Sequence, residues 1–151
     1  PKIWEELDME PAVVSQNSIK NVEMCPAGFC KRMKYNTIGI SMKLYNKYFQ
    51  MDMPCRTKIG VAGCRNACGG VYSKDVGVIA DTNGLLMVTA GGSAGFHPRI
   101  ADIVVRDVTE EEALVVIDKL FTYYQEEAQP GEKLGDFIER LGLDALKKAC
   151  K

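Results

Sequence analysis

Four cysteines in two close pairs constrain this chain more than any other feature of its sequence. Cys25 and Cys30 are separated by four residues, and Cys64 and Cys68 by three. Each pair lies in a stretch with glycine, where the backbone can approach a bound group closely. Four thiolates from two such loops are the ligand set of a cubane iron–sulfur cluster. The spacing therefore predicts that both loops meet at one metal site.

Three other interpretations of the same cysteines stay open at this point. A structural zinc site also takes four cysteines, although zinc ribbons favour two residues between the members of a pair. A thioredoxin-like redox pair has that same short spacing. Buried cysteines can also be ordinary small apolar side chains. Cys55 and Cys150 fit neither pair, and we expect both to be ordinary thiols.

The composition is that of one globular domain. The chain has 151 residues, of which 46% are hydrophobic and 26% charged, and its formal net charge is −1. These values argue against a disordered chain and against a nucleic-acid-binding protein. No apolar run approaches the roughly 20 residues that span a bilayer, and the first residues lack the apolar core of a signal peptide. We therefore expect a cytoplasmic protein that binds neither membrane nor nucleic acid.

Charge is unevenly distributed along the chain. Residues 31–58 contain seven basic side chains and one acidic one, whereas residues 107–144 contain eleven acidic and three basic ones. A cluster of positive charge can raise the local concentration of an anionic ligand. Such a run is also typical of a solvated helix face, so both interpretations stay open.

The pattern of apolar residues predicts an α+β fold, a small mixed or antiparallel sheet flanked by helices. Apolar side chains at three- and four-residue steps indicate helices, and Thr109 with Glu112 forms a capping box that opens one of them. Asn83-Gly84 predicts a hairpin. The expected elements are helices over 31–49, 110–127, 132–141 and 143–150, strands over 57–62, 75–80, 85–89 and 103–105, and a short extended piece at 11–14.

Several motifs resemble those of the nitrite and sulfite reductase family. Residues 58–68, KIGVAGCRNAC, are similar to the family's cluster signature K-I-x-x-x-G-C-x-N-x-C. Residues 74–78, the glycine-rich loop 91–99 and the segment 131–142 match further family motifs. The family's first cysteine pair is usually C-x5-C, where this chain has C-x4-C. We therefore expect an N-terminal extension over 1–20 and a cluster-binding domain over 21–151.

The resemblance implies a [4Fe-4S] cluster and a sirohaem as cofactors. The four metal ligands would be Cys25, Cys30, Cys64 and Cys68, with Cys68 also bridging to the sirohaem iron. Arg56 and Lys58 match basic positions that bind the sirohaem carboxylates and the oxyanion substrate, so they are the expected catalytic residues. Their alternation places both on one strand face, and cationic side chains suit anionic ligands.

Three more residues receive expected roles from their place in the resembling motifs. Asn66 would bind the cofactors by shaping the cluster loop, and Arg99 would contact a cofactor carboxylate. His97 stands in a loop rich in glycine and proline, where it could face the cofactor, but a hydrogen-bonded structural histidine is the favoured interpretation.

Three functional hypotheses follow. The first is a sirohaem–[4Fe-4S] reductase of sulfite or nitrite, which completes its site as a homodimer. The second is an electron-transfer or accessory module that holds only the cluster, and the third is a scaffold without catalytic cofactors. The first would take electrons from an electron donor protein.

Overall fold

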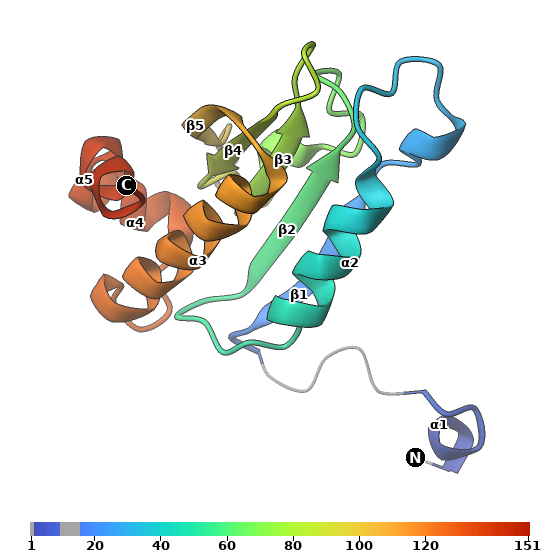
Figure 1. The fold of residues 1–151 in the computed structure, drawn as a ribbon. Coiled ribbons are helices and arrows are strands. Elements are labelled where there is room, and N and C mark those ends of the chain that lie inside the picture. Colours follow the sequence, from blue (N-terminus) through green and yellow to red (C-terminus); the bar gives the residue numbers. More distant parts are fainter. Residues whose placement is uncertain (1, 10–15) are drawn as a thin grey trace.

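The computed structural model describes residues 2–9 and 16–151, so the extended piece expected at 11–14 lies outside the described residues. Figure 1 shows one sheet with helices across one of its faces. The elements are α1 (Lys2–Glu6), β1 (Ile19–Met24), η1 (Ala27–Phe29), α2 (Thr37–Tyr48), β2 (Thr57–Ala62), η2 (Val71–Ser73), β3 (Val76–Ala80), β4 (Leu86–Ala90), β5 (Asp102–Val108), α3 (Glu110–Glu127), α4 (Leu134–Leu141) and α5 (Leu143–Ala149). The predicted α+β class is confirmed.

The sheet is mixed, and its five strands follow one another in the order of the chain. β1, β2 and β3 are parallel neighbours, whereas β3, β4 and β5 are antiparallel. The predicted hairpin joins β3 to β4, and Gly84 takes the positive φ of 81° that its turn requires. Because parallel strands end at the same edge of a sheet, the segments that follow β1 and β2 emerge side by side.

Two local predictions differ from the structure. The helix expected to begin at residue 31 begins at Thr37, where the side chain of Asn36 accepts a hydrogen bond from the amide of Ile38 at 3.1 Å. The residues before it are held elsewhere, since the amide of Lys34 donates to the carbonyl of Gly63 at 2.8 Å. Strand β1 has no clear alternation of apolar side chains and was not among the expected elements; its pairing with β2 makes it a strand.

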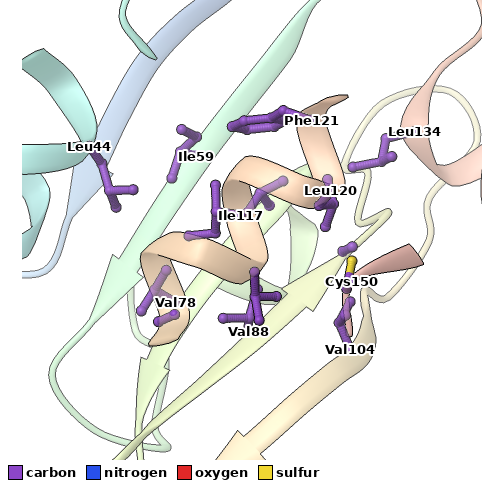
Figure 2. Packing of buried hydrophobic residues seen from close by; sticks show 14 of the residues in the cluster. Leu44, Ile59, Val78, Val88, Val104, Ile117, Leu120, Phe121, Leu134 and Cys150 are labelled. Carbon is purple, nitrogen blue, oxygen red and sulfur yellow. The ribbon is translucent and has the colours of Figure 1, made fainter. Parts of the chain in front are cut away.

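The helical face of the sheet carries the main hydrophobic core. Alternate residues of the strands, such as Ile59, Val78 and Val88, point toward α2 and α3 and are fully buried. Figure 2 shows these side chains packed around Ile117 and Phe121 of α3. α3 begins with the predicted capping box. This face is therefore a conventional apolar interface between helices and sheet.

The second face is covered by loops and by the short turn η2. Gly60 and Gly77 are partners across β2 and β3, and a Cβ at Gly77 would lie 2.7 Å from a methyl carbon of Val71. The two glycines thus let the chain after the cysteines lie flat on the sheet. A smaller apolar cluster lies beneath, with Ile79 and Met87 as members. In the described part of the chain, no helix is long and apolar enough to cross a membrane.

Candidate metal and anion-binding site

The two cysteine-bearing loops lie against each other at one edge of the sheet. Cys25 directly follows β1, and Cys64 follows β2 after one glycine. The amide of Cys25 donates to the carbonyl of Val61 at 3.0 Å, which continues the ladder between the two strands. The parallel pairing of β1 with β2, which neither motif alone predicts, thus brings the starts of the two cysteine-bearing loops together.

Close backbone packing then fastens the loops to each other. A Cβ at Gly63 would lie 2.7 Å from the Cβ of Ala27 and 2.9 Å from the carbonyl oxygen of Tyr35. The amide of Gly63 donates to the Sγ of Cys25 at 3.2 Å, and the hydroxyl of Thr37 donates to the carbonyl of Cys25 at 3.0 Å. Glycine is therefore required immediately before Cys64, because any side chain would push the two loops apart.

The thiols have the chemistry that a cluster needs. All six cysteines are free, and the backbone amides of Gly63 and Arg32 donate to the Sγ atoms of Cys25 and Cys30. Amide donors stabilise the negative charge of thiolate sulfur, so the donor set fits a [4Fe-4S] cluster. Within the described residues, however, no three His, Cys, Asp or Glu side chains are grouped to hold a metal ion. Ligation by all four cysteines therefore stays a prediction.

A basic cavity lies on the second face of the sheet, which also carries the cysteine loops. Lys58 alternates along β2 with the buried Ile59 of the helical face, and Ala62 farther along packs near Cys25. The cavity has a volume of about 300 Å³. Its charged lining residues are Arg56, Lys58, Lys74, Asp75 and Lys133, and the loop 92–95 forms one wall.

Three of the four cations in this cavity form no ion pair within the described part of the chain. Lys74 pairs with Glu23 on β1 and thereby lowers the pKa of that carboxyl. Arg56, Lys58 and Lys133 form no ion pair with any other described residue. Because unpaired cations facing one cavity favour an anionic occupant, the predicted pair Arg56 and Lys58 lies in a site of suitable charge.

Asp75 is the acid of this cavity, and its position is set by the backbone of β2. The amide of Lys58 donates to its Oδ2 at 2.8 Å. Burial raises the pKa of Asp75 to about 6, which outweighs the lowering by that amide and by the charge of Lys133. The carboxyl can therefore gain and lose a proton near neutral pH, beside the cations that would hold an anion.

The glycine-rich loop 91–99 closes the cavity against η2 and β3. The amide of Gly92 donates to the carbonyl of Lys74 at 3.0 Å, and that of Gly91 to the carbonyl of Asp75 at 2.7 Å. A Cβ at Gly92 would lie 2.3 Å from the carbonyl oxygen of Tyr72. This close approach explains why the loop needs glycine at that position.

Arg99, expected to contact a cofactor carboxylate, is engaged within the protein. Its guanidinium donates to the carbonyl of Gly91 at 2.9 Å, to Glu139 at 3.0 Å and to Asp102. These bonds tie the loop to α4 and β5. A contact between Arg99 and a cofactor stays a prediction, and it would require some of these bonds to be exchanged.

Asn66 and His97 both line cavities at the surface. Asn66 lies with Cys64 beside a cavity of about 300 Å³ that Lys31, Arg32 and Lys34 also line. His97 is exposed and lines a cavity of about 230 Å³ together with Cys55. The roles expected for these two residues stay predictions.

The two remaining cysteines lie apart from the cysteine-bearing loops. Cys150 is 7% exposed within the main core, where burial raises the pKa of its thiol to about 11. That environment is typical of an unreactive structural thiol. Cys55 is half-buried and lies next to the basic strand end.

The motifs contained three cavity residues to which the sequence assigned no role. Lys74 and Asp75 stand in the segment 74–78, and Lys133 stands in the segment 131–142. Because these residues stand in motifs that resemble one family, the sequence did offer a signal that they belong to a functional site. Their convergence on Lys58 becomes visible only in the folded chain.

Comparison with known proteins gives a family match over most of the chain. The model of the nitrite and sulphite reductase 4Fe-4S domain matches residues 15–151. An assimilatory-type sulfite reductase of Nitratidesulfovibrio vulgaris is 28% identical over 148 residues, which are 97% of this chain and 67% of that protein. A nitrite reductase [NAD(P)H] of Bacillus subtilis is 29% identical over 148 residues, 97% of this chain but 18% of that protein. The chain thus spans less than a fifth of this second relative.

Solved structures agree with the fold. Dissimilatory sulfite reductase I superposes with a TM-score of 0.83 at 13% identity, over 99% of this chain and 55% of that chain. The NirA protein of Mycobacterium tuberculosis superposes with a TM-score of 0.79 at 18% identity, over 99% of this chain and 30% of that chain. At these identities the likeness concerns the fold alone, and it confirms the expected architecture of a mixed sheet with helices.

Proposed function

Because this chain belongs to the nitrite and sulphite reductase 4Fe-4S domain family, we propose that it is an iron–sulfur redox protein that reduces a small oxyanion, sulfite or nitrite. In this proposal Cys25, Cys30, Cys64 and Cys68 hold a [4Fe-4S] cluster. The basic cavity binds the oxyanion and the carboxylates of a sirohaem. One observation supports the proposal above the others: the unpaired cations and the cysteine loops share the loop-covered face of the sheet.

Three charged residues of the cavity have definite tasks in this proposal. Arg56 and Lys58 hold the oxyanion through charge-assisted hydrogen bonds. Asp75 carries a proton on its carboxyl at a pH near its pKa of about 6 and delivers it to an oxygen of the bound anion. When bound, the cluster and the sirohaem supply the electrons and the open iron position for the reduction. Protein dipoles and cations stabilise the charge that develops on the anion.

The electrons come from a donor protein that docks beside the cysteine loops. Lys31, Arg32 and Lys34 are exposed next to Cys30. A surface with this charge favours a donor with an acidic face. A second copy of this chain belongs to the same proposal, because it would cover the open side of the cavity.

A second candidate function is an electron-transfer or accessory module that holds the cluster without sirohaem. The size of the basic cavity favours it, since about 300 Å³ lies at the small end of ligand pockets and suits an inorganic anion more than a tetrapyrrole. Under this alternative the cavity would bind an anion without reducing it.

The test begins with anaerobic purification, followed by the visible spectrum and by iron and sulfide analysis. About four irons per chain are expected for a cubane cluster, and additional bands of an isobacteriochlorin separate the reductase from the electron-transfer module. A colourless protein without iron after reconstitution would contradict both.

The role of Lys58 is tested by Lys58→Met. We expect this variant to keep its iron content and to bind sulfite or nitrite at least ~10-fold more weakly, about 1.4 kcal/mol. The matched control is Lys43→Met, because Lys43 pairs with Glu110 on the helical face and should leave anion binding unchanged. Equal affinity of Lys58→Met and the unaltered protein would refute the assignment.

A further inference from the structure

A second cavity lies beside the basic one, and Arg56 lines both. It has a volume of about 440 Å³ and is lined by Gln16, Asn17, Lys20 and Arg56. Two of these side chains are cations and the other two carry amides. None of these four described residues is acidic, so together they give the cavity the charge of an anion site.

A bulge in β1 positions Lys20 there. Ile19 pairs with Thr57 and Asn21 pairs with Lys58, so Lys20 is one extra residue opposite two consecutive residues of β2. Such a bulge redirects a side chain out of the regular alternation. Lys20 thereby lies at the start of β1, near the strand end that carries Arg56.

The ammonium group of Lys20 is buried without a partner. The residue is 9% exposed, and its Nζ has no hydrogen-bond partner among the described residues. A buried charge without an acceptor destabilises the folded state. The lysines that pair with carboxylates among the described residues, Lys43, Lys47 and Lys74, each have an acidic partner already. Lys20 is thus the cation with the strongest need for an anionic partner.

We propose that Lys20 and Arg56 form a second anion site, which takes a carboxylate or a small inorganic oxyanion. The inference builds on the proposed function, because Arg56 would then stand between two bound anionic groups. Either one ligand with at least two acidic groups spans Arg56, or two separate anions bind on its two sides. In both cases the side-chain amides of Gln16 and Asn17 can donate to the anion in the Lys20 cavity.

Inorganic sulfate is the probe for this site. The side-chain ammonium of Lys20 is observed by NMR of the protein labelled at its lysine nitrogens, and its signal should shift on titration with sulfate. Because Lys20→Met and Lys20→Arg lack the Lys20 signal, the variants are compared through the backbone amide signals of Gln16 and Asn17, which line the same cavity. By this readout Lys20→Met should bind sulfate at least ~10-fold more weakly, whereas Lys20→Arg should retain binding and Lys43→Met should behave as the unaltered protein.

Thermal unfolding gives a second readout that does not depend on the cofactors. Without sulfate, Lys20→Met should unfold at a higher temperature than the unaltered protein, because it no longer buries an unpartnered charge. Sulfate should raise the unfolding temperature of the unaltered protein more than that of Lys20→Met, since only the former gains the bound anion. A lower unfolding temperature for Lys20→Met and an equal response to sulfate would overturn the proposal.

The two sources of the anion are separated by loading the protein with sirohaem. If a cofactor carboxylate occupies the site, loading shifts the Lys20 signal and sulfate no longer does; if the site takes a free oxyanion, sulfate still shifts it. A Lys20 signal that responds to neither refutes the second site. Lys58→Met keeps the two proposals apart, because its loss of binding at the first cavity should leave the response of Lys20 to sulfate in place.

Discussion

The two faces of the sheet use charge in opposite ways. On the helical face, cations of α2 meet acids of α3: Lys43 pairs with Glu110, and Lys47 pairs with Asp118. On the loop-covered face, Arg56, Lys58 and Lys133 line a cavity together with Asp75 and form no ion pair with any described residue. The basic and acidic runs of the sequence therefore serve two purposes. Those on the helices join two elements, and those at the strand ends are available to a ligand.

Among substitutions that alter one face of the sheet and leave the other unchanged, we expect the largest effect from Cys68, on the iron content. We predict that Cys68→Ser removes nearly all of the iron and leaves the fold intact, because the loop lies on the sheet through Ala67 and Val71 rather than through the thiol. The measurement is iron content with far-ultraviolet circular dichroism. Cys150→Ala, in the core of the helical face, is the control and should retain the iron. Equal iron content in Cys68→Ser and the unaltered protein would remove Cys68 from the ligand set.

A large-to-small substitution in the core of the helical face should lower the stability of the fold. Ile117 is fully buried against the sheet, so Ile117→Ala should lower the free energy of unfolding by about 2–5 kcal/mol. Val115, in the same helix, is 50% exposed, and Val115→Ala should change that free energy by less than ~0.5 kcal/mol. Urea denaturation measures both. A similar cost at the two positions would show that the helical face is not the main source of stability.

The smallest expected effect is the pH dependence of folding stability that Asp75 contributes on the loop-covered face. Burial raises the pKa of Asp75 from 3.8 to about 6, so between these values the folded chain binds the proton more tightly than the unfolded chain does. Stability should therefore fall as the pH rises from about 4 to about 6, by on the order of 1–2 kcal/mol from this group. Asp75→Asn should lose this dependence. The test compares urea unfolding of both proteins from about pH 4 to about pH 7, and parallel curves would contradict the assignment.

Much of the architecture could be predicted because it depends on local pattern. Strand β2 occupies the predicted residues 57–62, since the small and branched apolar residues 59–62 suit a strand buried on both faces. The capping box at Thr109 and the turn at Gly84 depend on neighbouring residues alone. The cysteine spacing and the family motifs pointed to the family that the comparison confirms.

Other features depend on contacts between segments that are distant in the sequence, and the pattern of residues along the chain does not predict these contacts. Strand β1 exists because β2 pairs with it, and that pairing brings Cys25 to Gly63 and the second cysteine pair. Lys74 and Asp75 reach Lys58 because the chain around Val71 lies over Gly60 and Gly77, and Lys133 reaches the same cavity from the segment before α4. The roles of these residues, and the burial of Lys20, depend on the distances between charged side chains in the folded chain and on how far each is removed from water. Periodicity and spacing along one chain report which residues can be buried, and only tertiary packing decides which charges end up facing the same cavity.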